Sequence, residues 1–185
     1  MKKSERILSF LLACIFCIGS LFACSTNGTD TNVTEPDITR LDETTAENTP
    51  DPLLLADGGK TDYVIVRGEN AYITEVTAST ELQSYLKQIT GVEFPIVTDA
   101  TAPTEKEIVV GKTNRETEGE FDREELGEDG LVIKTKDKKL FLVGGEKRGT
   151  LYAVYEFLES YLGCRFYTVS LEKVPEQKTL FVSHI

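Results

Sequence analysis

The N-terminal 24 residues contain the feature that most limits how this chain can fold. A basic start is followed by the apolar stretch 7–23, which is interrupted only by two serines and one glycine and ends in alanine directly before Cys24. Positive charge, an apolar segment of this kind and a small-residue cleavage site are typical of a secretory signal peptide. The stretch is a marginal membrane span, because a span needs about 20 apolar residues. We therefore predict that residues 1–23 are removed as a signal peptide; the alternative is an uncleaved N-terminal anchor.

The ending Leu21-Phe22-Ala23-Cys24 resembles the lipobox of bacterial lipoproteins. This resemblance implies that Cys24 becomes the lipidated N-terminus of the mature chain and carries at least two acyl chains. Two chains hold a protein firmly on a membrane, whereas a single chain binds only marginally. The expected location is therefore extracytoplasmic and lipid-anchored to the cell membrane, with the membrane as a partner through the lipid on Cys24.

The cysteines leave no pair for an internal disulfide. Of the four in the chain, two lie in the predicted signal peptide and one is Cys24, so only Cys164 remains in the part expected to fold. The neighbours of Cys164 are largely apolar, which predicts a buried and inert thiol. One cysteine and one histidine, His184, cannot build a zinc site of three or four ligands. We predict no metal site.

The charge balance excludes one class of partner, and its distribution marks a tether. The formal net charge is −11. This excess of acidic side chains argues against nucleic acid as a partner, because nucleic acid binding needs clustered lysine and arginine. Threonine, proline and acidic residues dominate residues 24–60, and such a segment buries too little apolar surface to fold. We predict a disordered, acidic, Thr-rich tether, whose one apolar patch, Leu53-Leu54-Leu55, can dock on the following domain.

Residues 61–185 are predicted to form one α+β domain, in which two main helices pack on one face of a mixed sheet. Apolar residues from Ala78 to Ile89 recur at helical spacing and indicate the first helix. Its N-cap is expected at Thr77 or Ser79, and its end at Gly91. The second helix is expected over about 147–162, followed by Gly163.

Short strands complete the predicted domain. They are expected at 63–66, 94–97, 107–111, 130–135, 140–143, 164–168 and 179–182. The fourth and fifth form a hairpin, because the alternating residues 130–135 are followed by Lys138-Lys139, which turns the chain into the apolar strand 140–143. A polar loop is expected over 112–129.

A glycine-rich turn between a strand and a helix is the first candidate site. The turn Gly144-Gly145-Glu146-Lys147-Arg148-Gly149 can place helix N–H groups around an anion. Its spacing matches neither a dinucleotide-binding motif nor a phosphate-binding P-loop. Glycine also supplies the positive φ of a tight turn, and this second interpretation is favoured. No cofactor is predicted.

Carboxylates supply the other candidates for chemistry. Glu156 and Glu159 lie three residues apart on one predicted helix, and glycoside hydrolysis requires a carboxylate pair. They lie on the polar side of that helix, where glutamates are ordinary. The acidic cluster between 118 and 129 lacks the ligand spacing of a calcium loop, so we interpret it as a solvated acidic loop. No nucleophile elbow occurs in the sequence, and no catalytic residue is predicted.

Four segments carry a resemblance to a known family: Gly130-Leu-Val-Ile-Lys134, Leu140-Phe-Leu-Val-Gly-Gly145, Arg148-Gly-Thr-Leu-Tyr-Ala-Val-Tyr-Glu-Phe-Leu-Glu159 and Leu162-Gly-Cys-Arg-Phe-Tyr167. They resemble the N-terminal domain that precedes the catalytic barrel in family 67 α-glucuronidases and family 20 β-hexosaminidases, and most of all the matching domain of large bacterial lipoproteins. The resemblance implies a β-hexosaminidase N-terminal-domain-like α+β fold, with the catalytic carboxylates in the following barrel. The sequence ends at Ile185, where that barrel is expected to begin, so no catalytic residue can be transferred. Arg148 matches the family's Arg-Gly helix start, without an implied role.

The expected function is that of a membrane-anchored surface lipoprotein carrying a non-catalytic accessory domain of a glycoside-hydrolase-type protein. A glycan or a separate catalytic barrel is its expected partner. The alternative is a stand-alone glycan- or protein-binding module at the cell surface. Its aromatic platforms would come from Tyr63, Tyr72, Tyr152 and Tyr167. An enzyme is the third hypothesis, and it requires a catalytic pair that the sequence does not reveal.

The second helix predicts a surface for such a partner. Its apolar stripe is about 160° wide, whereas a helix packed on one neighbour needs about 100°. Phe157 and Tyr161 lie toward one margin of the stripe, and Tyr152 lies beyond the other. We therefore expect an exposed apolar or aromatic patch. The alternative is that the sheet and the loop 112–129 cover the stripe on both sides.

Overall fold

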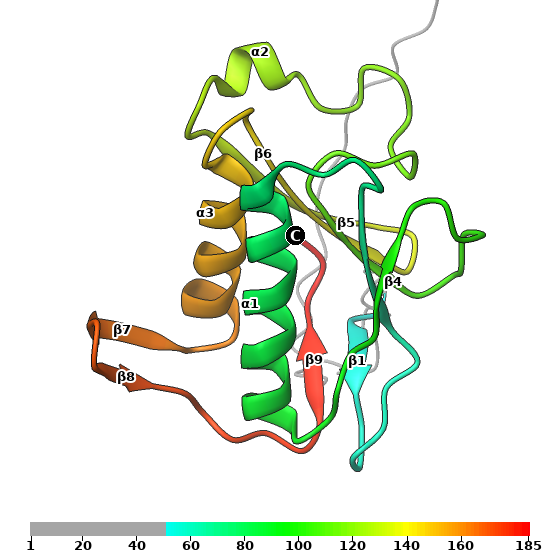
Figure 1. Cartoon of the computed structure of the whole chain (residues 1–185). Helices are drawn as coiled ribbons and strands as arrows, with labels where there is room; N and C mark the ends of the chain where they lie inside the picture. The colour runs from blue at the N-terminus through cyan, green and yellow to red at the C-terminus, as the bar shows by residue number, and fades with distance from the viewer. Residues whose placement is uncertain (1–50) are drawn as a thin grey trace, which may run out of the picture. The chain divides into compact units, whose positions relative to one another are not determined.

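The computed structural model describes residues 51–185 (Figure 1). The predicted signal peptide, Cys24 and most of the predicted tether lie outside the described residues. Within residues 51–185, a central mixed sheet carries two main helices on one face, which confirms the predicted α+β class. No helix in this part of the chain is long and apolar enough to cross a membrane.

Five strands form the central sheet in the order β3-β2-β4-β6-β5. They are β2 (Val64–Arg67), β3 (Ile96–Thr98), β4 (Glu107–Val110), β5 (Leu131–Lys136) and β6 (Lys139–Gly144). Four of them run parallel, and β5 alone is antiparallel, to β6. The predicted hairpin is confirmed, and its turn places Asp137 at a φ of 54°, a left-handed conformation that aspartate tolerates better than most residues.

Helix α1 (Ile73–Thr90) begins earlier than predicted. The expected caps Thr77 and Ser79 lie inside the helix, where their hydroxyls donate to carbonyl groups of the preceding turn. The N-cap is Tyr72, whose backbone N–H donates to the Glu75 carboxylate at 3.0 Å. A glutamate at this position can satisfy the cap N–H by reaching back over the first turn, which fixes where the helix begins.

Helix α3 (Gly149–Glu156) continues into one π-helical turn, η1 (Phe157–Tyr161). Together they confirm the helix predicted over about 147–162. Gly91 after α1 and Gly163 after η1 have φ values of 76° and 79°. Both predicted glycine ends are therefore confirmed, because only glycine adopts this backbone conformation without cost.

The main core lies between the two helices and one face of the sheet. Its fully buried members include Leu82 and Leu86 of α1, Val154 of α3, Leu158 of η1, and Ile65, Ile108, Leu140 and Leu142 of the strands. Burying a side chain of this size stabilises a fold by roughly 1.5–3 kcal/mol. This cluster therefore determines how the helices are held over the sheet (Figure 1).

The opposite face of the sheet is covered by the segment between β4 and β5. Phe121 of this segment packs against Val109, Phe141 and Val143. The Phe121 and Phe141 ring centroids are 5.7 Å apart. The segment was expected to be a polar loop, yet it contains the short helix α2 (Arg123–Leu126). It is an ordered cover for the sheet, because one aromatic side chain in it reaches the apolar strand residues.

Strands β1 (Leu53–Ala56) and β9 (Leu180–Val182) form a separate antiparallel pair. This corrects the predicted tether boundary at residue 60, because the folded unit already includes β1. The expected docking of the Leu53-Leu54-Leu55 patch is confirmed, with Leu53 and Leu55 buried in the main core. Three apolar residues in a polar context are enough to form a strand here, because β9 supplies partners for their backbone hydrogen-bonding groups.

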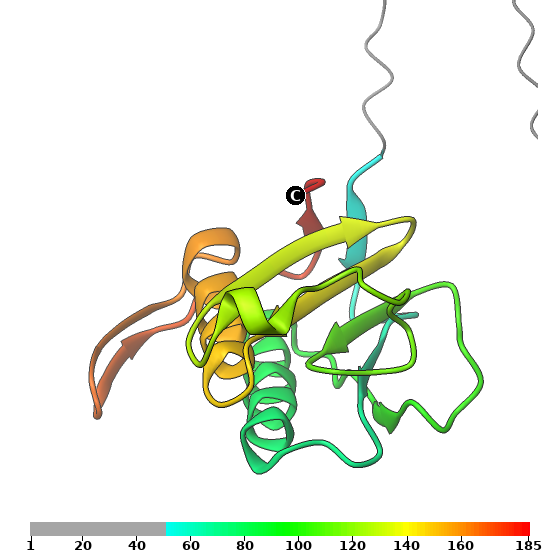
Figure 2. The same ribbon diagram turned by 90° about the horizontal axis from the view of Figure 1, so that it is seen from above.

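Strands β7 (Arg165–Thr168) and β8 (Leu171–Lys173) form a second separate pair, which projects from the body of the domain (Figures 1 and 2). The strand predicted at 164–168 is confirmed, and β8 was not predicted. The hairpin is anchored by Phe166, whose ring lies edge-on to Tyr85 and Tyr155. The Tyr85 hydroxyl also donates to Glu172 at 2.8 Å.

Candidate functional site

The carboxyl ends of β2, β4 and β6 border a polar concave surface. Each strand leads into a loop, at 68–71, 111–114 and 144–148. Two adjoining hollows of about 260 and 390 Å³ lie among these loops. Both hollows are lined by Asn70, Tyr72, Glu75 and Lys112. We define these hollows as the Tyr72 crevice. Ligands of open sheets with parallel strands usually bind at this edge.

Glu75 forms the floor of the Tyr72 crevice. Its carboxylate accepts the Tyr72 N–H at 3.0 Å through one oxygen and the Lys112 N–H at 2.8 Å through the other. Gly111 has a φ of 75°, and a Cβ there would lie 2.2 Å from Glu75 Oε1. Glycine at 111 therefore lets the loop after β4 approach the carboxylate. Glu75 is a structural floor, because both of its oxygens already bind backbone donors.

Tyr72 forms the rim of the crevice. Its side chain is 64% exposed, and it also lines a third hollow of about 360 Å³ together with Ile73, Glu146 and Lys147. Its backbone is fixed, since its carbonyl accepts the N–H groups of Glu75 and Val76 at 2.9 and 3.0 Å. The result is an exposed aromatic ring on a rigid base.

Three polar side chains line the same hollow as this ring: Asn70, Lys112 and Glu146. Within residues 51–185, no hydrogen bond or ion pair occupies the amide of Asn70, the ammonium of Lys112 or the carboxylate of Glu146. Arg123 also lines the crevice, but its guanidinium is held by Glu116 at 2.7 and 2.8 Å. The crevice therefore offers an aromatic face together with both donors and acceptors.

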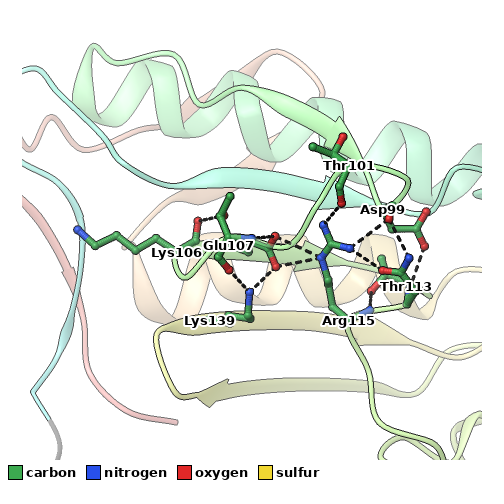
Figure 3. A network of polar contacts seen from close by, with 9 residues as sticks. Asp99, Thr101, Lys106, Glu107, Thr113, Arg115 and Lys139 are labelled. Carbon is green, nitrogen blue, oxygen red and sulfur yellow. Dashed lines mark hydrogen bonds and ion pairs between the residues drawn. The ribbon is translucent and has the colours of Figure 1, made fainter.

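A buried ion-pair network is centred on Glu107, the first residue of β4 (Figure 3). The side chains of Glu107 and Arg115 are 1% and 3% exposed, with the Arg115 Nε 3.1 Å from the Glu107 carboxylate. Lys139 contacts the same carboxylate. Burial opposes ionisation of Glu107, but hydrogen bonds from Lys139, the Thr104 N–H and Arg115 outweigh it, so the pKa of Glu107 is lowered.

This network holds loops rather than substrate. Arg115 donates to the carbonyl groups of Asp99 and Thr101 as well as to Glu107. The guanidinium therefore ties the segments on either side of β4 together. Sequence reasoning missed it, although a glutamate opening the apolar strand Glu107-Ile-Val-Val was a signal that a buried partner exists.

The glycine turn before α3 is a tight turn, as predicted, but the predicted reason is wrong, because none of its glycines has a positive φ. Close approach of the backbone requires glycine here instead. A Cβ at Gly144 would lie 1.9 Å from the Gly149 backbone, so the strand and the helix start touch. The N–H groups of Arg148 and Gly149 both donate to the Glu128 carbonyl at 2.9 and 3.1 Å. The protein itself thus uses these donors. The Arg148 side chain pairs with Asp129 at 2.8 Å.

The acidic loop is more ordered than predicted. Glu120 is held by Lys134 and Lys136, Glu128 contacts Lys147, and Asp129 pairs with Arg148. The largest influence on Glu120 is the hydrogen bond from the backbone N–H of Thr117. Together with the Thr117 hydroxyl and the two lysines it outweighs burial and lowers the pKa of Glu120 to about 2. No group of three metal-binding side chains occurs among residues 51–185. These carboxylates fasten the loop to the domain.

The other candidate residues separate into buried and exposed groups. Glu156 is exposed and accepts the Ser160 hydroxyl at 2.6 Å, as expected of a residue on the polar side of a helix. Cys164 is buried, and burial raises the pKa of its thiol, which disfavours the reactive thiolate. Tyr63 is 2% exposed and cannot be a platform.

The predicted aromatic surface is present in part. Tyr72, Tyr152 and Tyr167 are exposed, whereas Phe157 is buried. Tyr161, which stacks on Phe157, is also exposed. The apolar stripe of the second helix is therefore only partly covered. The hairpin β7–β8 adds Val169 and Leu171 to the exposed apolar side chains, which the sequence did not predict.

One comparison with known proteins identifies the family. A family model described as glycosyl hydrolase family 67 N-terminus matches residues 60–157. No curated protein matches the chain. The expected likeness to the family 20 domain stays a prediction. The matched range contains α1, the five-stranded sheet and the Tyr72 crevice, and it covers more than half of the sequence. The chain belongs to the family of glycosyl hydrolase family 67 N-terminal domains.

Proposed function

We propose that this chain is a lipid-anchored surface protein whose folded unit is a non-catalytic accessory domain of a glycoside-hydrolase-type protein. The observation that carries the proposal is the family match over residues 60–157, since its description places this type of domain on the N-terminal side of a glycosyl hydrolase. The catalytic chemistry would then belong to a separate module.

The carboxylates of the described residues support a non-catalytic role. Glycoside hydrolysis usually needs two carboxyl groups about 5–10 Å apart on either side of a sugar bond. The buried carboxylates Glu75, Glu107 and Glu120 accept hydrogen bonds that hold loops together. Glu156 of α3 is exposed, and Glu159 of η1 is half-buried. Each of these groups serves the fold or the surface.

The β7–β8 hairpin is the proposed docking element for the catalytic module. Its exposed apolar side chains are Tyr167, Val169 and Leu171, and it projects from the domain (Figure 2). It lies C-terminal to the family-matched range, which ends at residue 157. Contacts between domains typically bury 600–1,500 Å², and a projecting apolar hairpin supplies a natural centre for such a contact.

Anchoring through Cys24 completes the proposal. The lipobox-like ending supports acylation of Cys24, and residues 24–50 would then connect the lipid to the start of the folded unit. An acidic, Thr-rich connection of this length reaches tens of ångströms from the membrane. In this position, the domain and its docked module would have access to glycans outside the cell.

Hydrolysis by the isolated chain tests the proposal. Purified residues 25–185 are incubated with aryl glucuronides and aryl N-acetylhexosaminides, and release of the aryl group is followed against a buffer control. We expect no release above that control. Turnover that disappears in Glu156→Gln or Glu159→Gln would overturn the accessory role and make the helix an active site.

One observation favours a second function. The exposed Tyr72 ring shares its hollows with polar side chains that have no hydrogen-bond partner within residues 51–185, which is the character of a ligand-binding surface. A stand-alone glycan-binding module would need such a site, and the accessory domain is compatible with it.

A further inference from the structure

We propose that the Tyr72 crevice binds a sugar ring, which stacks on Tyr72 while Asn70, Lys112 and Glu146 bind its hydroxyl groups. The choice of a glycan as the ligand rests on the proposed function. The site itself rests on geometry: two adjoining hollows meet at one exposed aromatic ring on the carboxyl edge of the sheet.

The aromatic ring is the first element of the site. Tyr72 is 64% exposed, although its backbone is fixed by three hydrogen bonds with Glu75 and Val76. A flat ring on a rigid base loses little conformational entropy when a ligand covers it. The apolar C–H face of a pyranose fits such a ring, and its hydroxyl groups point outward toward the surrounding side chains.

The polar side chains are the second element. A sugar hydroxyl both donates and accepts hydrogen bonds, so it needs donors and acceptors around it. Lys112 supplies a donor, Glu146 supplies an acceptor, and the Asn70 amide supplies both. Within residues 51–185 none of these groups is occupied by another side chain, so they reach a ligand without breaking an existing pair.

The charges around the crevice select against other small ligands. The carboxylates of Glu75 and Glu146 line the same hollow as Lys112 and Arg123, and Arg123 is already paired with Glu116, so a phosphate or another compact anion meets repulsion as well as attraction. The oxygens of Glu75 already accept two backbone N–H groups, so they do not provide a cation site. A neutral polyhydroxylated ring matches this mixture better.

The other exposed tyrosines lack this arrangement, and one face of the Tyr161 ring is already stacked on Phe157. The Arg148 guanidinium lies over the Tyr152 ring at 6.0 Å from its centroid, so that face is already occupied. Tyr167 lies on the projecting hairpin, whose other exposed large side chains, Val169 and Leu171, are apolar. Tyr167 is therefore the matched control for an exposed tyrosine outside the crevice.

Nuclear magnetic resonance titration tests the site. ¹⁵N-labelled residues 25–185 are titrated to about 10 mM with hexasaccharides of xylose, glucose and N-acetylglucosamine, and with a glucuronate-bearing xylan fragment. We expect saturable shifts confined to the amides of 68–73, 111–114 and 144–147 for at least one probe. Tyr72→Ala should weaken that binding at least about ten-fold, Tyr72→Phe should keep it, and Tyr167→Ala should leave it unchanged.

The contradicting outcomes are equally specific. The absence of saturable shifts with all four probes would overturn the site, as would binding that Tyr72→Ala leaves intact. Shifts confined to 165–173 would place the binding surface on the hairpin instead. Amide peaks away from the crevice show whether Tyr72→Ala is folded; if it is not, Lys112→Ala gives the same test. Failure here leaves the non-catalytic role standing, whereas aryl glycoside turnover would remove that role without affecting the sugar site.

Discussion

The Glu75 carboxylate accepts the backbone N–H of Lys112 at 2.8 Å, although the two residues are 37 positions apart. Its other oxygen binds the N–H of Tyr72. One buried side chain therefore joins the start of α1 to the loop after β4 and shapes the Tyr72 crevice.

Replacing Glu75 should destabilise the domain. Glu75→Ala leaves two backbone N–H groups without partners, and each unsatisfied donor costs about 1–3 kcal/mol. We expect the free energy of unfolding to fall by about 2–4 kcal/mol in urea titrations. Glu69→Ala is the control, since its side chain is exposed, and it should change stability by less than about 0.5 kcal/mol. Equal stability of the two variants would remove the structural role of Glu75.

The Glu107 network should make stability depend on pH. The pKa of Glu107 is lowered from 4.5 in the folded domain, so its ionised form adds stability at pH above 4.5. This contribution is lost as the pH falls below 4.5 toward the folded pKa. Glu107→Gln leaves the buried Arg115 and the partly buried Lys139 without their carboxylate partner, so we expect a loss of about 3–5 kcal/mol at pH 7 that shrinks as the pH falls.

Urea unfolding at several pH values between 7 and 3 measures this difference. Glu105→Gln is the control, because its pair with Lys138 is exposed and such pairs contribute about 0–1 kcal/mol. A gap between wild type and Glu107→Gln that stays constant from pH 7 to 3 would contradict the assignment.

Strand β1 should be required for stability. Leu55 is buried in the core and its neighbour Leu54 is exposed, so the two leucines form a matched pair on one strand. Leu55→Ala should cost about 2–5 kcal/mol of unfolding free energy, and Leu54→Ala less than about 1 kcal/mol. Thermal and urea unfolding check this. Equal effects of the two changes would mean that β1 does not pack as described.

The β7–β8 hairpin should mediate weak association. Its exposed Tyr167, Val169 and Leu171 form an apolar surface, and such surfaces favour contacts between molecules. Residues 25–185 should show concentration-dependent sedimentation that Leu171→Ser reduces. Phe181→Ser, which changes an equally exposed side chain on β9, should have a smaller effect. A purely monomeric chain at millimolar concentration would refute association through the hairpin.

Lipidation should depend on one thiol. Cys24→Ala should abolish metabolic labelling with a fatty acid and release the protein from membranes, because acylation needs the Cys24 sulfur. Cys17→Ala, a change within the predicted signal peptide, should leave labelling intact. Labelling that persists in Cys24→Ala would exclude this anchor.

Local patterns predicted most of the elements but few of the contacts that shape the site. The spacing of Leu82, Leu86 and Ile89 indicated α1, and the alternation of 130–135 before Lys138 indicated the β5–β6 hairpin, because these signals are contained in neighbouring residues. Strand β1 was assigned to the tether, since its partner β9 lies more than 120 residues away. A pattern read along the chain cannot supply such a distant backbone partner.

The Tyr72 crevice was predicted only in two separate pieces, the Tyr72 platform and the glycine turn 144–149. Tyr72 was named as a platform, but the residues beside it come from three separate loops. The role of Glu75 depends on Lys112, and that of Glu107 depends on Arg115 and Lys139. The only local signal for Glu75 was its position three residues after the N-cap, and the cap itself was placed too late.

The β1–β9 pair also determines how the folded unit responds to a pulling force. Leu53 pairs with Val182, and His184 Nε2 lies 2.9 Å from the Asp51 carbonyl oxygen, so the two ends of the unit are neighbours. A load applied across residues 51 and 185 would open this antiparallel pair one hydrogen bond at a time. Ile185 is also hydrogen-bonded to Thr135 of β5, so the same load would reach the edge of the five-stranded sheet at that contact. The β1–β9 pair and the Ile185–Thr135 contact would therefore bear the load before the inner strands of the sheet do.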